Sequence, residues 1–176
     1  WQKMINMKVK TLIEKIKKLS RGKNIKLMEV CGTHTMSIYR NGINRLLPQN
    51  IELLSGPGCP VCVTPNDFID KALDLSNNKD IIITTFGDMI KVPGSFSSLA
   101  RQKAQGANVE IVYSPEDALK IALQNKNKEV VFLGVGFETT APSIAFTILN
   151  AKLKKLNNFS VLCGHKLIPP ALEILC

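Results

Sequence analysis

The sequence predicts an α/β protein with open parallel sheets covered by helices, of the doubly wound, Rossmann-like kind. Two observations predict this class: six short segments are near-continuous apolar runs, and segments with helical patterns separate them. Apolar runs without alternation are typical of parallel strands that are buried on both faces. Strands that alternate with helices form right-handed βαβ units and an open sheet.

The first expected element is an amphipathic helix over residues 1–21. Apolar residues recur there at helical spacing, namely Ile5, Val9, Leu12, Ile13, Ile16 and Leu19. Nine of the chain's 23 Lys and Arg residues lie between Lys3 and Lys26, and the lysines within this helix form its outer face over a core. A nucleic-acid surface is the alternative, but no aromatic residue is interleaved with these lysines to stack on bases, so nucleic acid is not an expected partner.

The six strands are expected at residues 25–30, 51–55, 80–86, 108–113, 129–135 and 159–163. Two of the helices between them carry start signals. Thr64 and Ser114 stand in the N-cap position, and each is followed by a proline at the first helical position. Gly106 ends the third helix in the position that favours glycine.

The polar segment Asn125–Lys128 is the expected internal boundary, because four strand-helix units are complete before it. The predicted organisation is an N-terminal helix over residues 1–21, a first α/β lobe over 22–126 and the start of a second lobe over 127–176. The chain lacks an initial methionine and stops inside an apparent helix. We therefore expect it to be a piece of a longer protein with a truncated second lobe.

The cysteine content and the hydropathy favour a reduced, cytoplasmic protein. Five cysteines are an odd number, and no signal-peptide pattern precedes them, which argues against a disulfide-stapled secreted scaffold. The longest apolar run, Val130–Phe137, is far shorter than the roughly 20 residues of a spanning helix. No membrane association is expected.

Two cysteine motifs follow the first two strands. Cys31 and His34 lie in the first, and Cys59 and Cys62 in the second, with the CxxC spacing of dithiol/disulfide couples. In open α/β sheets, function sits beyond the carboxyl ends of the strands. Cys31 precedes a helix expected to begin near Thr35, and Cys62 precedes the helix capped by Thr64; the field at a helix N-terminus favours a thiolate.

The remaining loops at this edge carry weaker candidates. Asp88, Glu138 and His165 are expected to line a cleft as polar groups; the alternatives are a helix cap for Asp88 or Glu138 and a packed or capping role for His165. Small residues in these turns could let backbone amides approach a small anion, or serve only as turn residues; they are Gly56, Gly58, Gly94, Gly136, Thr33 and Thr35. Cys163 ends an apolar strand and is expected to be a small buried hydrophobic residue.

Five motifs in order resemble the HypD family of [NiFe] hydrogenase maturation factors: CGTHT, GPGCPVC, TFGDM with VPGS, GFETTAP, and HK followed by PPA. The resemblance implies two similar α/β lobes facing a cleft, and a scaffold rather than a turnover enzyme. With HypC, such a scaffold assembles the Fe(CN)2CO unit, and HypE delivers the cyanide. The family's [4Fe-4S] cysteines lie in a C-terminal region that this chain lacks, so we expect no cluster here.

The resemblance implies the role of Cys31, and residue chemistry suggests roles for the other site residues. Cys31 would be the iron ligand, shared with a cysteine of HypC, and Cys59 and Cys62 would be a redox dithiol. His34 would orient or protonate groups at that iron, and Asp88, Glu138 and His165 would act on cyanide or protons.

Two other functions fit the residues. Cys31, His34, Cys59 and Cys62 could form a Cys3His zinc site, since both motifs have zinc-like spacing. The glycine-rich turns could serve an α/β enzyme that binds a small anion, although neither a P-loop nor a dinucleotide fingerprint is present.

Overall fold

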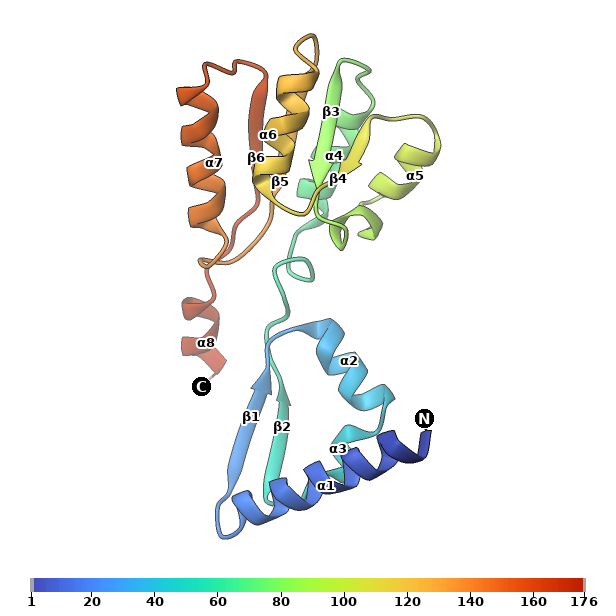
Figure 1. Ribbon diagram of the computed structural model, residues 1–176, viewed down its shortest axis with the longest axis vertical. Coiled ribbons are helices and arrows are strands. Elements are labelled where there is room, and N and C mark those ends of the chain that lie inside the picture. The colour runs from blue at the N-terminus through green and yellow to red at the C-terminus, as the bar shows by residue number, and fades with distance from the viewer. Residues whose placement is uncertain (1, 176) are drawn as a thin grey trace. The chain divides into compact units, whose positions relative to one another are not determined.

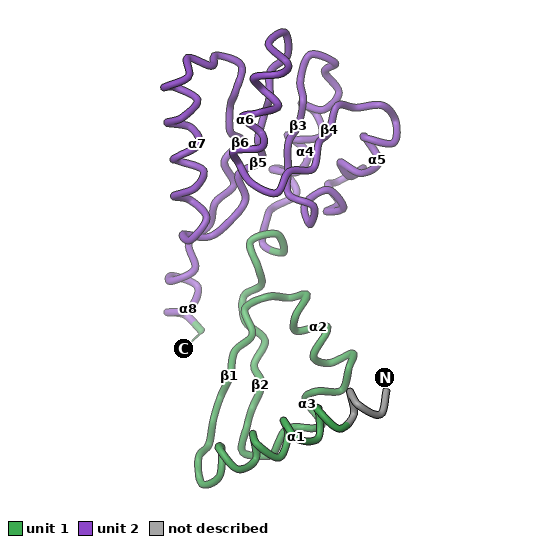
Figure 2. The backbone as a smooth tube through the Cα atoms, in the orientation of Figure 1, with its two compact units in different colours: residues 1–62, 175 green, residues 63–174, 176 purple. Residues whose placement is uncertain are grey.

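The computed structural model describes residues 2–175, and the side chains of residues 7–175. It is an α/β structure in which every sheet is parallel and is flanked by helices (Figure 1). The chain forms two compact units that meet at Cys62 and Val63 (Figure 2). No helix in the described part of the chain is both long and apolar enough to cross a membrane.

Unit 1, up to Cys62, is built on two parallel strands. Its elements are α1 (Gln2–Ser20), β1 (Ile25–Glu29), α2 (Gly32–Arg40), α3 (Ile43–Leu46) and β2 (Ile51–Ser55). The register pairs Glu29 at the end of β1 with Ser55 at the end of β2. The two loops that carry the cysteine motifs therefore leave the same edge of this sheet.

The predicted N-terminal helix is confirmed as α1, but its apolar face is only partly covered. Ile13 and Ile16 are half-buried, whereas Leu12 and Leu19 are 58% and 68% exposed. Ile5 lies outside the described side chains. A two-stranded sheet offers too little surface to bury the whole stripe within unit 1.

Unit 2, Val63 to Ile174, contains a four-stranded sheet with the order β4-β3-β5-β6. Its elements are α4 (Asn66–Ser76), β3 (Ile81–Thr85), the 3-10 helix η1 (Met89–Lys91), α5 (Leu99–Ala104), β4 (Val109–Ile111), α6 (Pro115–Gln124), β5 (Glu129–Gly134), α7 (Ala141–Leu153), β6 (Phe159–Cys163) and α8 (Pro169–Leu175). Helix α4 packs against α5, and α6 packs against α7. The strand order reverses between β3 and β5, which makes this a doubly wound sheet with its switch point there.

All six predicted strands are confirmed, with ends that differ by at most two residues. Ser114 is the N-cap of α6, and its hydroxyl accepts a hydrogen bond from the Asp117 amide. Gly106 follows α5 with φ +94°, as predicted. Helix α4 begins one residue later than expected, with Pro65 instead of Thr64 at the N-cap position.

The hydrophobic core lies in unit 2. Every hydrophobic side chain described as buried falls between Phe68 and Ala151, and β3 and β5 are buried along almost their whole length. The ring of Phe132 in β5 packs edge-on against Phe86, with centroids 5.4 Å apart. Burial on both faces, predicted for every strand, is correct for β3 and β5, whereas Leu27 in β1 is 50% exposed.

The structure does not divide at the predicted boundary. Strands β3 and β5 lie on either side of residue 126, yet they pair in one sheet, with Ile81 beside Glu129 and Thr84 beside Phe132. The polar segment at Asn125–Lys128 is the turn between α6 and β5. Unit 2 consequently joins much of the expected first lobe with the expected second one.

Candidate functional site

Cys59 and Cys62 form a contact pair in the loop after β2. Both thiols are free, and their Sγ atoms lie 2.9 Å apart. The Cys62 amide also donates to Cys59 Sγ at 3.4 Å, which closes the loop on itself. Cys59 is half-buried and Cys62 is exposed.

The glycines of this loop have conformational reasons to be glycine. Gly58 is buried with φ +102°, a conformation that other residues rarely adopt. The Gly56 amide donates to Glu29 O, and a Cβ on Gly56 would lie 2.9 Å from that oxygen. Their suggested role toward an anion stays a prediction.

Cys62 lies at the N-terminus of α2. Its sulfur accepts hydrogen bonds from the backbone amides of Gly32 and Thr33. A Cβ on Gly32 would be 3.3 Å from this sulfur, so the glycine leaves the approach open. From the sequence we expected Cys62 to precede the N-terminus of α4, the next helix in the chain. The backbone amides that its sulfur contacts belong to α2.

These contacts shift the pKa values of the two thiols in opposite directions. The hydrogen bond from Cys59, together with the α2 amides, lowers the pKa of Cys62. Burial, and then the contact with Cys62, raises the pKa of Cys59 to about 11. Cys62 is therefore the thiol of the pair that loses its proton more readily, and the S–H of Cys59 can then donate to its sulfur.

Cys31 is the N-cap residue of α2 and is half-buried. Its amide donates to Glu29 Oε1 at 2.9 Å, and the same oxygen lies 3.4 Å from His34 Nδ1. Glu29 therefore links the cysteine and the histidine of the first motif. Sequence reasoning missed this residue, although an acid two positions before Cys31 at a strand end was a usable signal.

Thr33 and Thr35 belong to the first turn of α2, which begins at Gly32, earlier than predicted. The Thr35 amide donates to Cys31 O at 2.9 Å. Thr33, Met36 and Arg40 of α2 line an open groove of about 740 Å³ together with Cys62. The reactive sulfur is thus accessible from the surface.

Within the described residues, Cys, His, Asp and Glu side chains do not gather in groups of three or more that could hold a metal ion. His34 faces Glu29, and its side chain is 69% exposed. The zinc interpretation stays a prediction.

The other three predicted site residues lie in unit 2, in the loops after β3, β5 and β6. Asp88 is exposed at the N-cap position of η1, with no capping hydrogen bond from its side chain. Glu138 Oε1 accepts from the Ile168 amide at 3.0 Å. His165 contacts Thr140 and Cys163. Glu138 and His165 thus belong to two loops that touch.

Cys163 was expected to be a buried hydrophobic residue, but it is exposed. In β6, Ser160 and the last residue, Cys163, are exposed, whereas the other three residues are half-buried. Two of the glycines expected to approach an anion also have packing reasons to be glycine. A Cβ on Gly94 would lie 3.0 Å from Leu73 Cδ1, and one on Gly136 would overlap the Thr140 hydroxyl.

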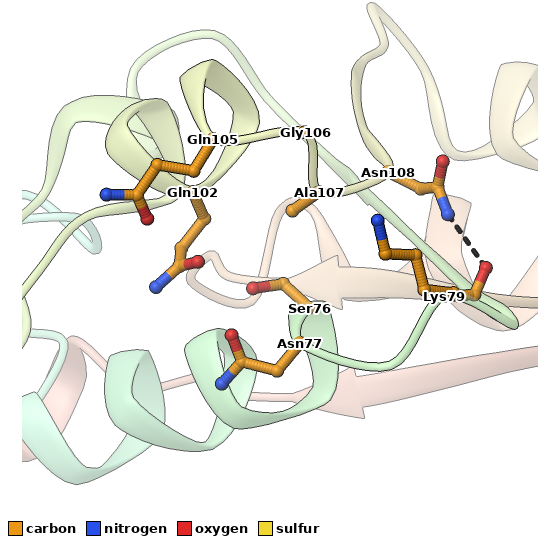
Figure 3. A pocket seen from close by; sticks show the side chains of 8 residues that line it. All are labelled: Ser76, Asn77, Lys79, Gln102, Gln105, Gly106, Ala107 and Asn108. Carbon is orange, nitrogen blue, oxygen red and sulfur yellow. Dashed lines mark hydrogen bonds between the residues drawn. The ribbon is translucent and has the colours of Figure 1, made fainter.

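A small polar cavity lies at the opposite end of the unit 2 sheet, before β3 and β4. It has a volume of about 230 Å³. Figure 3 shows the side-chain amides of Asn77, Gln102 and Gln105 around it, and the hydrogen bond that the side-chain amide of Asn108 donates to the Lys79 backbone carbonyl. None of the predicted site residues lines this cavity.

Comparison with known proteins assigns the family. The HypD family model, described as "Hydrogenase formation hypA family", matches residues 7–176. The chain is 48% identical over 151 residues to the hydrogenase maturation factor HypD of Escherichia coli, covering 86% of this chain and 40% of that protein. It is 51% identical over 152 residues to HypD of Cupriavidus necator, with 86% and 40% covered.

An archaeal relative shows the same relationship. A putative hydrogenase expression/formation protein of Methanocaldococcus jannaschii is 45% identical over 168 residues, which cover 95% of this chain and 47% of that protein. The chain thus spans less than half the length of these relatives. It belongs to the HypD family.

Proposed function

We propose that this chain acts in hydrogenase maturation, as part of a scaffold on which the Fe(CN)2CO unit is assembled jointly with HypC, with HypE delivering the cyanide. Family membership supports the process. The observation that carries the residue roles is the arrangement at α2, where Cys31 caps the helix and the Cys62 sulfur is bound by amides of its first turn. The proposed place of work is the cytoplasm, where thiols stay reduced.

Cys31 is the proposed ligand of the iron, which is cargo and not a resident cofactor. Thiolate sulfur suits a soft, cyanide-bearing iron. Cys31 lies at the end of β1 beside an open groove, so a cysteine of HypC can approach the same iron from outside. The Glu29 carboxylate links the Cys31 amide to His34 and so holds the imidazole close to the proposed iron ligand.

Cys59 and Cys62 are the proposed electron source. When the Cys62 thiolate and the Cys59 thiol form a disulfide, the pair releases two electrons and one proton, and the acceptor is the iron unit under assembly. Contact at 2.9 Å means that bond formation requires little movement of the loop. The thiolate at Cys62 is the form from which oxidation proceeds.

The test combines the anaerobically purified chain with HypC and HypE and measures bound iron and the infrared bands of iron-bound cyanide and carbon monoxide. Cys31→Ser is expected to lose the iron. Cys59→Ser is expected to keep iron without the full ligand bands, whereas Cys163→Ser, a matched cysteine variant in unit 2, behaves as the parent. Full ligand bands with Cys59→Ser would refute the dithiol relay.

Zinc is measured on the same samples. One zinc per chain, with Cys31, Cys59 and Cys62 protected from alkylation, would replace the scaffold proposal by the Cys3His site. No zinc, together with reversible loss of two thiols at Cys59 and Cys62 on mild oxidation, supports the dithiol.

A further inference from the structure

A second thiol cluster lies in unit 2, and the proposed function assigns it no step. Cys163 is the last residue of β6, His165 follows two residues later, and Thr140 directly precedes α7. Cys163 Sγ lies 3.4 Å from His165 Nδ1, and Thr140 Oγ1 lies 3.3 Å from His165 Nε2. The imidazole therefore lies between a thiol and a hydroxyl.

The hydrogen bonds of Thr140 determine which ring nitrogen carries the proton. Its hydroxyl has one hydrogen, which it donates to Phe137 O at 2.9 Å. Thr140 Oγ1 can then only accept from His165, so the hydrogen of the neutral ring is on Nε2. Nδ1 presents its lone pair to Cys163 Sγ and can take the proton of that thiol.

The surrounding backbone holds this arrangement in place. The Gly164 amide donates to Gly134 O at 2.8 Å, and the Lys166 amide donates to Gly136 O at 3.0 Å. Glycine is required at two of these positions: a Cβ on Gly134 would lie 2.9 Å from Val161 Cγ1, and one on Gly136 would overlap the Thr140 hydroxyl. The two loops are thus joined on both sides of His165, as a reactive group needs.

We propose that Cys163 is an activated thiol that exchanges with low-molecular-weight disulfides, with His165 as its base and Thr140 as the positioning residue. His165 Nδ1 takes the thiol proton, and the Cys163 sulfur attacks one sulfur of the disulfide. The original S–S bond breaks, a mixed disulfide forms on Cys163, and the leaving thiolate takes the proton from Nδ1. One S–S bond replaces another, so no further oxidant or reductant is consumed.

The mixed disulfide is the expected end product. The exposed side chain of Cys163 admits the disulfide. The described residues of unit 2 contain no second cysteine that could displace the bound thiol. This makes Cys163 a site of reversible S-thiolation, separate from the dithiol of unit 1.

The test uses oxidised glutathione on the reduced chain and follows modification by mass spectrometry of tryptic peptides. Peptide 156–166 contains Cys163 and no other cysteine, and peptide 27–40 contains Cys31 alone, which serves as the internal reference. His165→Gln keeps an N–H that can reach Thr140 but removes the base facing the sulfur. The Cys163 rate is expected to fall by about 100-fold, the lower end of general-base effects, while the Cys31 rate is unchanged.

Thr140 provides a second, independent variant. Thr140→Val keeps the shape and removes the acceptor, so the Cys163 rate is expected to fall several-fold, and Thr140→Ser is expected to restore it. A His165→Gln chain that melts at the parent temperature and exchanges at the parent rate would overturn the proposal. Equal slowing of Cys163 and Cys31 would overturn it too, because the effect would not belong to the cluster. If His165→Gln fails to fold, equal rates for Thr140→Val and the parent decide against it.

Discussion

At the scale of single residues, Cys62 and Cys59 differ in the pKa of their thiols, which makes them chemically distinguishable. The pKa of Cys62 is lowered by the hydrogen bond from Cys59 and by the α2 amides, whereas burial and Cys62 raise that of Cys59 to about 11. Between these two values, only Cys62 is a thiolate. Iodoacetamide on the reduced chain is therefore expected to alkylate Cys62 before Cys59, which fragmentation of the peptide carrying both will show.

Removing the donor should weaken this preference. Cys59→Ala is expected to raise the pKa of Cys62, so that its alkylation at neutral pH slows, while Cys59→Ser retains a hydroxyl donor and slows it less. Rates measured from pH 6 to 10 give the pKa directly. Alkylation of Cys59 first in the parent chain would contradict the assignment.

The sequence was sufficient to identify these cysteines, but not the groups that tune them. The CxxC spacing and the CGTHT motif are local patterns, and the resemblance to the HypD family rests on them. The amides that bind Cys62 come from Gly32 and Thr33, about thirty residues earlier, and reach it only because parallel pairing of Glu29 with Ser55 aligns two strand ends. Thr140 was missed for the same reason, since its partner His165 is 25 residues away.

At the scale of elements, the loop after η1 is held against α4 by hydrogen bonds to one carboxylate, that of Asp70. Asp70 accepts from the Ser95 amide at 2.7 Å and from the Ser95 hydroxyl at 2.6 Å. These bonds lower the pKa of Asp70 below its ordinary 3.8. A carboxyl with a lowered pKa in the folded state stabilises the fold above its unfolded pKa, and the contribution is lost as the pH falls through the folded value.

Asp70→Asn is accordingly expected to lower the melting temperature at pH 7, and the difference from the parent should shrink as the pH falls below 3.8. Asp74→Asn, an exposed position on the same helix, is the matched control and should shift the melting temperature less. A difference between Asp70→Asn and the parent that does not change with pH would show that the loss is not due to the ionised carboxylate.

Gly164 lets the loop after β6 pack closely against Phe68 of α4. A Cβ there would lie 2.7 Å from Phe68 Cε2, and the Phe68 ring is only 7% exposed, so it has little room to move. Gly164→Ala is expected to lower the free energy of unfolding by about 1–3 kcal/mol, the usual cost of overpacking. Urea unfolding measures it, with Gly87→Ala as control, because a Cβ at Gly87 makes only an ordinary 3.6 Å contact. Equal effects of the two changes would contradict the packing argument.

At the scale of the whole molecule, strand positions were predictable from the sequence and the division into units was not. A polar run such as Asn125–Lys128 has the composition of a linker, but composition does not reveal that β3 and β5 pair across it. The observed boundary passes through the loop of Cys62, which the sequence presented as a chemical motif. Strand order depends on contacts between distant segments, which local patterns do not encode.

Because the buried hydrophobic side chains lie in unit 2, we expect the two units to unfold locally and independently of each other. Strands β3 and β5 are buried in unit 2, whereas β1 and β2 are half-buried or exposed in a two-stranded sheet, an arrangement of marginal stability. Local opening is easiest where few apolar side chains are buried. Amide hydrogen exchange is therefore expected to be fast in residues 25–29 and 51–55 and slowest in residues 82–84 and 130–133.

Phe132→Ala tests the independence directly. Phe132 is fully buried, so its truncation is expected to destabilise unit 2 by about 3–5 kcal/mol and to speed exchange in β3 and β5. Exchange in β1 and β2 should stay as in the parent, because their opening already precedes that of the core. If the same substitution accelerated exchange equally in all four strands, the chain would unfold as one cooperative body, and the stability of the cysteine loops would depend on the core of unit 2.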